Sequence, residues 1–193
     1  MQAAQVRRPN WDRLFEFAVG QSGLFTTKQA AEAGYSPQLL VHYVRIGRAV
    51  RVLRGVYRLV HFPLQQDEEF VTMWLWSEQQ GVFSHETALS MHQLSDVLPN
   101  HIHLTLPLAW KKRRLRAPPG VILHHADLTD AERGWWGSVP RTSPARTLND
   151  CAAIHLSPEF LMQAYYQALH RRLINQSDVP DVLQALKPYM DPA

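Results

Sequence analysis

Two short helix patterns followed at once by a hairpin pattern constrain the first 60 residues more than any other feature of the chain. Residues 26–29 read Thr-Thr-Lys-Gln, a capping-box spacing in which a threonine and a glutamine bond reciprocally to the backbone at a helix start. Ser36 and Pro37 predict a second helix, because serine caps a helix and proline in the first turn loses no hydrogen bond. Gly34 predicts a tight turn between them, which gives a helix-turn-helix.

A further helix is predicted before this pair, and two strands are predicted after it. Asn10 can cap a helix whose apolar residues recur at the spacing of one buried face. Residues 50–59 read as two short β-branched strands around an Arg-Gly turn. A two-residue turn at Arg54 and Gly55 places Arg51 opposite Arg58, a repulsive pair unless an anion lies against it, whereas a Gly-bulge turn shifts this register by one. Together these elements predict a winged helix.

The positive charge is concentrated in the same N-terminal third. Residues 1–63 carry nine Lys or Arg against three Asp or Glu, a net +6, whereas residues 64–193 carry 11 against 14, a net −3. Such asymmetry favours a module that binds a polyanion, attached to a second domain. A winged helix that makes only protein contacts is the alternative. In the DNA-binding interpretation the second helix of the pair enters the major groove and the wing arginines hold phosphates. The predicted DNA-binding residues are Thr27, Ser36, Gln38, His42, Arg45, Arg48, Arg51, Arg54 and Arg58.

Residues 64–193 predict a larger domain of mixed helices and strands. Apolar runs between proline-containing turns predict strands at residues 101–106, 121–124 and 138–142. Helices are predicted to begin near residues 67, 84, 143, 157 and 178. The expected fold class is therefore α+β, with a winged helix-turn-helix at residues 1–63 and an α+β domain at residues 64–193.

One loop of this second domain is strongly basic. Residues 111–116 carry five positive charges between two predicted strands. A solvated loop and a second contact to nucleic acid, a nucleotide or a partner are both consistent with such a run. The residues of this possible second contact are Lys111, Lys112, Arg113, Arg114 and Arg116.

We find no catalytic, metal-binding or cofactor-binding pattern in the sequence. Histidines recur on two predicted strands, with 101 and 103 on one and 124 and 125 on the other, but without carboxylates or cysteines at ligand spacing. Cys151 is the only cysteine and is predicted to lie in the core. Glycine-rich phosphate loops are also missing. We therefore expect no catalytic residues, no metal and no cofactor.

Composition bears on the compartment as well. The longest apolar runs fall well short of the roughly 18 to 20 residues that cross a bilayer. The N-terminal residues lack the apolar stretch of a secretory signal. A single cysteine allows no intrachain disulfide, which suits the cytoplasm. We expect a cytoplasmic protein without a membrane span.

The sequence resembles the AbiEi antitoxins of bacterial type IV, or abortive-infection, toxin–antitoxin systems. The resemblance lies in an ordered series of short motifs along nearly the whole chain: residues 25–31, 34–36, 47, 52–57, 84–89, 103–105 and 139–150. It implies a winged helix that binds inverted repeats in its own promoter and represses it. It also implies a C-terminal domain that antagonises a nucleotidyltransferase-like toxin encoded beside it. The endonuclease-like extension of many relatives is not expected here, since the chain ends at Ala193.

Two other function classes stay open at this point. A stand-alone winged-helix transcriptional regulator could use its second domain for dimerisation or for ligand sensing, with Trp74, Trp76, Trp135 and Trp136 around a pocket. An orphan nuclease could use the histidines and the basic loop. An inverted-repeat operator requires two reading helices, supplied either by a dimer or by two monomers that pair on DNA.

Overall fold

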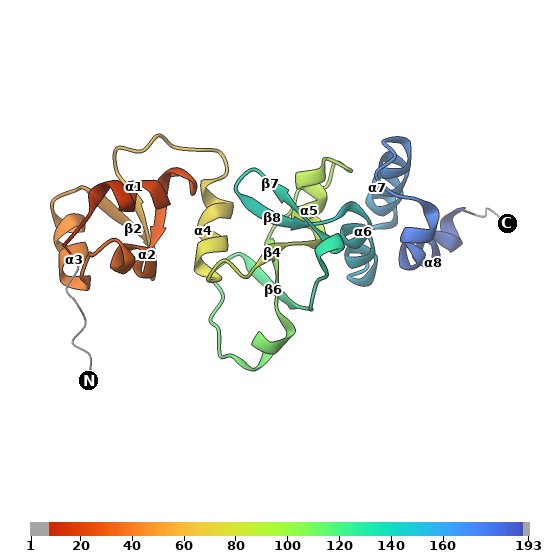
Figure 1. Cartoon of the computed structure of the whole chain (residues 1–193). Helices are drawn as coiled ribbons and strands as arrows, with labels where there is room; N and C mark the ends of the chain where they lie inside the picture. Colours follow the sequence, from red (N-terminus) through yellow and green to blue (C-terminus); the bar gives the residue numbers. More distant parts are fainter. Residues whose placement is uncertain (1–7, 191–193) are drawn as a thin grey trace. The chain divides into compact units, whose positions relative to one another are not determined.

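The computed structural model describes residues 8–190, and the chain divides into two compact units, residues 1–79 and 80–193 (Figure 1). Both units combine helices with a sheet, so the predicted α+β class is confirmed. Among the described residues, no helix has the length and apolar character needed to cross a membrane.

The first three helices begin where the sequence predicts. They are α1 (Trp11–Val19), α2 (Thr27–Glu32) and α3 (Pro37–Arg45). The Asn10 side chain accepts a hydrogen bond from the backbone at the start of α1, and both hydrogen bonds of the capping box between Thr26 and Gln29 are present. Ser36 caps α3 by accepting from the Leu39 amide at 3.2 Å.

The three strands of the first unit form an antiparallel sheet. They are β1 (Leu24–Thr26), β2 (Ala49–Leu53) and β3 (Val56–Leu59), in the order β1-β3-β2. The hairpin turn lies at residues 54–55 as predicted, because Leu53 pairs with Val56. An irregularity between Arg51 and Leu53 then shifts the register. Of the two registers that the sequence leaves open, the one shifted by one residue is observed, because Arg51 lies opposite Tyr57 and not opposite Arg58.

A fourth helix, α4 (Glu68–Trp76), completes the first unit. It contacts all three strands of the sheet. The preceding Asp67 accepts a hydrogen bond from Ser22 at 2.8 Å, and Gln79 donates to Gln21 at 3.0 Å. The boundary predicted between residues 63 and 64 therefore precedes a helix that packs on the first unit. Residues 1–79 carry nine basic and seven acidic residues, a net charge of +2. The net charge of +6 on residues 1–63 is therefore a property of one part of this unit and not of the whole unit.

A compact apolar core holds the winged helix together. Leu14 and Ala18 of α1, Leu40 of α3 and Leu59 of β3 are almost fully buried around Phe25. Burying a side chain of this size contributes roughly 1.5 to 3 kcal/mol relative to leaving it exposed. The helices therefore present their remaining faces to solvent in fixed orientations.

A mixed five-stranded sheet forms the centre of the second unit. Its strands are β4 (Val82–Phe83), β5 (Ile102–Leu106), β6 (Val121–His125), β7 (Arg133–Trp136) and β8 (Val139–Thr142), in the order β6-β5-β4-β8-β7. The pairs β5–β6 and β4–β8 are parallel, and the others are antiparallel. Three of these strands were expected, at β5, β6 and β8. The two-residue β4 is too short to leave a sequence pattern, and β7 was missed.

Four helices belong to the same unit: α5 (His85–His92), α6 (Pro144–Ala153), α7 (Pro158–His170) and α8 (Pro180–Met190). Leu148 and Cys151 of α6, Tyr165 of α7 and Val182 of α8 share one buried core with Leu89 of α5. Figure 1 shows α6, α7 and α8 grouped together, while the loop between β5 and β6 extends away from them. That loop contains the short 3-10 helix η1 (Leu108–Lys112); η2 (Asp130–Glu132) and η3 (Gln176–Asp178) are equally short.

Candidate nucleic-acid interface

The outer face of α3 is polar, basic and accessible. Gln38, His42 and Arg45 lie at i, i+4 and i+7, so they form one stripe along the helix, and all three are exposed. Val41 beside them is 67% exposed, while Leu40 on the opposite face is buried in the core. The structure thus brings together the residues that the sequence predicts for the reading helix.

Two predicted site residues, Ser36 and Thr27, hold the elements around this face in place by hydrogen bonds to the backbone. Ser36 is exposed, and its hydroxyl is used to cap α3. Thr27 begins α2, where its amide and its hydroxyl both donate to the carbonyl of Gly55, at 2.9 and 3.3 Å. Thr27 therefore ties the tip of the wing to the helix-turn-helix. Gly55 adopts a φ of 84°, a left-handed conformation that glycine accepts without a steric cost.

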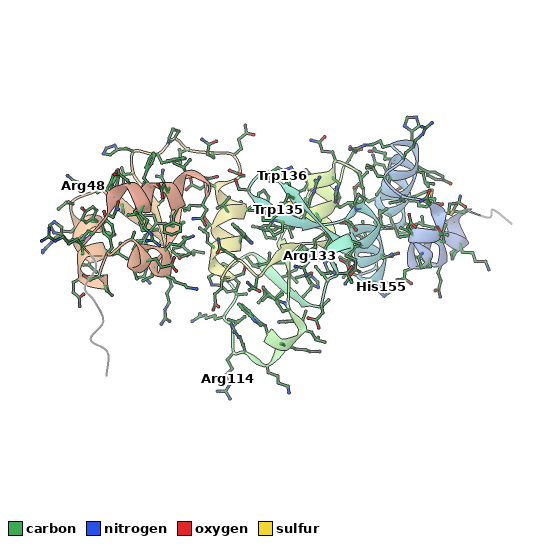
Figure 2. The ribbon with its side chains drawn as sticks, viewed as in Figure 1. Arg48, Arg114, Arg133, Trp135, Trp136 and His155 are labelled. Atoms are coloured by element: carbon green, nitrogen blue, oxygen red, sulfur yellow. The ribbon has the colours of Figure 1, made fainter. Side chains whose placement is uncertain are left out.

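Three further arginines lie on or next to the wing. Arg51 and Arg54 are exposed, and Nε of Arg51 donates to the carbonyl of Leu53 at 3.4 Å. Arg48, labelled in Figure 2, precedes β2, with its guanidinium 5.6 Å from the centre of the Tyr43 ring. This cation–π contact orients the Arg48 side chain beside α3.

Arg58 lies apart from this group. Its Nε is 3.4 Å from Oε1 of Glu68 on α4, and its Nη1 donates to the carbonyl of Phe62. The side chains of Arg58 and Glu68 are only 18% and 20% exposed. The sequence analysis groups Arg58 with the cations of the wing, but in the structure the Arg58 guanidinium is paired with Glu68 of the first unit.

The remaining arginines form one cationic surface, which we call the α3–wing surface and define by Arg45, Arg48, Arg51 and Arg54. Within residues 8–190, none of these four has an acidic partner at ion-pair distance. Unpaired guanidinium groups beside an exposed polar helix are suited to phosphates on either side of a DNA groove. Gln and Arg on the helix can each bond bidentately to a base edge, to adenine and to guanine respectively.

Residues 12–60 match the family model described as "Transcriptional regulator, AbiEi antitoxin". We call residues 12–60, which are similar to this family, the AbiEi segment. The match runs from α1 to the end of β3, so the AbiEi segment includes the whole α3–wing surface.

The other comparisons are sparse. The RV2827C protein from Mycobacterium tuberculosis has a crystal structure that is similar at 19% identity and a TM-score of 0.45, covering 98% of this chain and 85% of that one. No curated protein matches the chain.

The basic loop of the second unit is a separate cationic feature. Trp110 is buried, and the guanidinium of Arg113 lies 3.7 Å from the centre of its ring. The five basic side chains predicted as a possible second contact, from Lys111 to Arg116, are exposed. Figure 2 shows Arg114 at the far end of this loop, directed outward. A buried tryptophan therefore anchors a loop whose charges are accessible.

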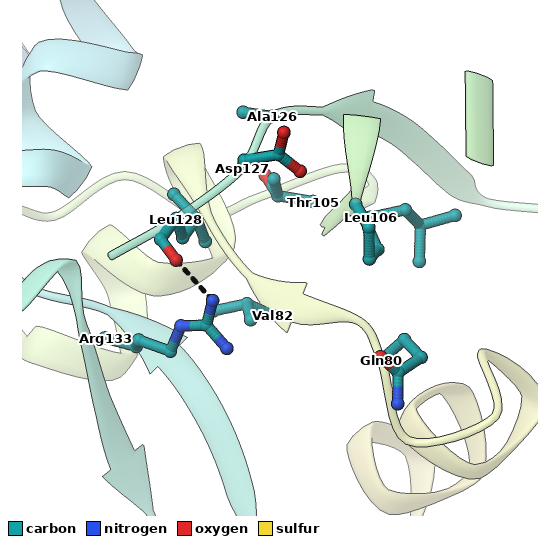
Figure 3. A pocket seen from close by; sticks show the side chains of 9 residues that line it. Gln80, Val82, Thr105, Leu106, Ala126, Asp127, Leu128 and Arg133 are labelled. Carbon is teal, nitrogen blue, oxygen red and sulfur yellow. Dashed lines mark hydrogen bonds between the residues drawn. The ribbon is translucent and has the colours of Figure 1, made fainter. Parts of the chain in front are cut away.

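Described residues of the second unit line a smaller and a larger pocket. The smaller one of about 130 Å³ lies between β4, β5 and the segment from Ala126 to Leu128, and Arg133 closes one side by donating to the carbonyl of Leu128 (Figure 3). The larger one of about 520 Å³ is lined by Trp135, Trp136, Arg141 and Arg171 among others. Trp74 and Trp76 lie on α4 in the first unit and do not line it. The four tryptophans therefore do not share one pocket.

An ion-pair network lies at the start of α6. Arg146 pairs with Asp150 at 2.8 Å and with Glu132 at 2.7 Å. Backbone and side-chain hydrogen bonds from Thr129 and Arg146 lower the pKa of Glu132 to about 2, whereas burial raises the pKa of Asp150 above its usual range. Ser143 occupies the cap position of α6, but its side chain makes no capping hydrogen bond.

Histidines from separate elements of the second unit lie close to one another, which the sequence analysis does not predict. His103 and His124 approach each other from β5 and β6, with Nδ1 and Nε2 3.0 Å apart. His85, which the sequence pattern did not group with them, stacks on His124 with ring centres 3.6 Å apart. Burial lowers the pKa of His85 to about 3 and that of His124 to about 4, so these rings are neutral near pH 7. Cys151 is buried, which raises the pKa of its thiol and makes it a poor nucleophile.

Proposed function

We propose that the chain is a DNA-binding antitoxin that represses its own promoter and counteracts a nucleotidyltransferase-like toxin. The observation that carries the DNA-binding part is the α3–wing surface: four arginines without acidic partners among the described residues, beside an exposed polar helix. The family of residues 12–60 supports a regulator or antitoxin. The proposal assigns no catalytic activity to the chain.

In this proposal α3 enters the major groove and the wing lies along the phosphate backbone. Gln38 and Arg45 lie on the exposed stripe of the helix and reach base edges, while Arg51 and Arg54 hold phosphates. Thr27 keeps the wing tip at a fixed position relative to the helix-turn-helix. Repression of an inverted-repeat promoter uses two copies of the chain, one on each half-site.

A binding titration with the DNA upstream of the gene tests this part of the proposal. Removing Arg51 and Arg54 together is expected to weaken binding to all DNA sequences and to lower the slope of log K against log salt by about 1.8, since each phosphate contact contributes about 0.9. Arg172→Ala removes an exposed arginine of the second unit and serves as the control. Unchanged affinity and an unchanged salt slope in the double variant would contradict the assignment.

The toxin part requires a growth assay. The full chain, co-expressed with the neighbouring gene, is expected to restore the growth of cells that this gene inhibits. The Arg51→Ala, Arg54→Ala variant, expressed from a foreign promoter, is expected to restore growth equally well if antagonism is separate from DNA binding. A neighbouring gene that does not encode a nucleotidyltransferase-like protein, or no rescue by either chain, would contradict this part.

The pocket beside Trp135 favours one alternative function, a stand-alone regulator that senses a ligand. Trp135 is 66% exposed at its rim, and Arg133, Arg141 and Arg171 also line it. Exposed aromatic and cationic groups around a cavity of about 520 Å³ suit an anionic aromatic molecule. A nucleotide that raises the melting temperature of the wild-type chain but not of Trp135→Ala would favour this alternative.

A further inference from the structure

Three buried or half-buried histidines converge in the second unit from separate elements. His85 begins α5, His103 lies on β5 and His124 lies on the neighbouring parallel strand β6. One ligand nitrogen from each ring can be chosen so that all three lie within 4.8 Å of one another. Residues distant in sequence therefore present three imidazole nitrogens to one small volume.

The sheet register produces this convergence. In the parallel pair, Thr105 lies opposite His124 and His103 lies opposite Ile122. His103 and Thr105 project from the same side of β5, as His124 does from β6, because side chains two residues apart share a face. The Nδ1 of His103 and the Nε2 of His124 consequently face each other at 3.0 Å, a separation suited to two nitrogens that share one hydrogen or one metal ion.

His85 is held toward the other two rings by its own chain of hydrogen bonds. Its Nδ1 lies 2.8 Å from Oγ of Ser84, and Thr105 donates to the same Ser84 oxygen at 2.7 Å. With Nδ1 engaged by Ser84, Nε2 of His85 is the nitrogen that remains for a ligand. An outer hydrogen bond of this kind fixes the orientation of histidines that bind metals.

The backbone at His85 is unusual for a residue that only fills space. Its φ is 53°, in the left-handed region that non-glycine residues rarely adopt. Residues held in this region are strained and cluster at functional sites. An apolar ring would fill the same volume without needing partners for buried nitrogens.

From this geometry we propose that His85, His103 and His124 form a three-histidine site for a divalent transition-metal ion of the Zn²⁺ type. Imidazole nitrogens are ligands that zinc prefers, and three protein ligands leave the fourth tetrahedral position open to water or to an external ligand. The site lies in the second unit, apart from the AbiEi segment, and is independent of the proposed DNA binding.

Zinc alone is the probe for the first experiment. The full chain without a histidine tag is stripped with a chelator, loaded with ZnCl₂, dialysed and analysed for metal content. We expect about one zinc per chain, and a rise of melting temperature of about 5 to 10 °C in the presence of a hundredfold excess over the dissociation constant.

Matched variants separate this site from adventitious binding. His124→Phe keeps a flat ring in the stack but has no nitrogen, and His103→Gln provides a second variant if the first does not fold. His125→Phe on the same strand is the control, because that histidine is not part of the cluster. The cluster variants are expected to lose the bound zinc and the thermal shift, and the control to keep both.

Cobalt substitution supplies a readout that does not depend on any variant. Co²⁺ bound by three imidazoles in a tetrahedral or five-coordinate site gives a much stronger visible absorption band than hexaaqua Co²⁺, which is octahedral and absorbs only weakly. Failure of the wild-type chain to retain zinc above the level of His124→Phe, or a cobalt spectrum identical to that of the free ion, would overturn the proposal.

Discussion

Arg58 on β3 and Glu68 at the start of α4 form an ion pair, with Nε and Oε1 3.4 Å apart. The pair connects the wing strand to a helix that the sequence assigns to the following domain. It also removes Arg58 from the group of cations without acidic partners. The pair adds to the packing of α4 on the sheet of the first unit, which ends at Gln79, and it explains why Arg58 is not part of the α3–wing surface.

Arg58→Ala is expected to affect stability more than DNA binding. Within the described part of the chain, Oε2 of Glu68 is buried without a hydrogen-bond partner, so removing Arg58 leaves a carboxylate with little compensation. We expect a loss of about 1 kcal/mol in the free energy of unfolding, at the upper end for ion pairs of this exposure. Urea denaturation measures this loss, and a DNA titration checks that the salt slope is unchanged.

Arg51→Ala is the matched comparison for Arg58→Ala. It removes an arginine from the same sheet, but one that is exposed and without an acidic partner among the described residues. We expect the reverse result: unchanged stability and a salt slope lower by about 0.9. If Arg58→Ala lowers the slope by the same amount, the ion pair opens on DNA and Arg58 belongs to the α3–wing surface.

Gly23→Ala is expected to disrupt the connection between α1 and β1. Gly23 has a φ of 81°, and a Cβ added there would lie 2.5 Å from Cγ of Phe62. Left-handed backbone costs an L-residue about 1 to 2 kcal/mol, and overpacking adds about 1 to 3 kcal/mol, so we expect a loss of at least about 2 kcal/mol. Urea denaturation of the variant and the wild-type chain measures the difference.

Gly20→Ala is the control in the same connection. Gly20 has a right-handed φ of −74°, and a Cβ added there would have nothing within 4 Å of it. Alanine is therefore expected to be neutral or to stabilise by up to about 1 kcal/mol. Equal melting temperatures for the two variants would show that Phe62 moves aside at little cost.

Local signals explain which elements could be predicted from the sequence. The caps at Asn10, Thr26 and Ser36 each depend on residues within three positions of one another, so the starts of α1, α2 and α3 are predictable. The hairpin sequence leaves two registers open, and only the structure shows that the shifted one occurs, through an irregularity between Arg51 and Leu53. Nothing in the sequence of α4 tells which unit its apolar face covers.

The contrast between local and long-range signals also applies to the candidate sites, the polar stripe of α3 and the histidine cluster. The stripe of Gln38, His42 and Arg45 follows from helical periodicity alone and could be read from the sequence. The histidine cluster needs the parallel register of β5 and β6 together with the position of α5, so the third member, His85, could not be found by spacing. The position of His85, directly after the serine at the start of α5, is only a weak signal.

Arg45→Ala and Gln38→Ala are expected to change specificity rather than general affinity. Both side chains are on the exposed stripe of α3, where a bidentate contact with a base contributes about 1 to 3 kcal/mol of discrimination. Binding to the cognate promoter should weaken by about five- to 150-fold, while binding to unrelated DNA changes much less. Selection from a randomised DNA library measures this, and an unchanged consensus would place both residues outside base contacts.

His92 is expected to make stability depend on pH between about 4 and 6.5. Burial lowers the pKa of His92 to about 4, although its Nε2 bonds to the carbonyl of Thr142 at 2.8 Å. Below pH 6.5 the unfolded chain binds a proton at this position that the folded chain does not, so stability falls as pH falls through this window.

The variant His92→Gln isolates this contribution. The glutamine amide can still donate to the Thr142 carbonyl but does not titrate. The difference in unfolding free energy between wild type and variant, measured by urea denaturation from about pH 4 to pH 7, is expected to shift in favour of the variant as the pH is lowered. A difference that stays constant over this range would show that His92 has the same pKa in the folded and the unfolded chain.

Glu132 is expected to stabilise the folded chain in its charged form, and this contribution is lost at a lower pH than the one at which His92 titrates. Hydrogen bonds from the Thr129 backbone and from Arg146 lower its pKa to about 2, below the value of about 4.5 in an unfolded chain. Its contribution is therefore complete above pH 4.5 and is lost as the pH falls toward 2. Glu132→Gln should destabilise the chain at neutral pH, and this deficit relative to wild type should shrink steadily between pH 4.5 and pH 2 in urea denaturation.

Asp150, the second partner of Arg146, provides the contrast. Burial raises the pKa of Asp150, so the stability difference between Asp150→Asn and wild type should not shrink in the same way between pH 4.5 and pH 2. If both variants show the same pH profile, the two carboxylates titrate as one unit around Arg146 rather than as separate groups.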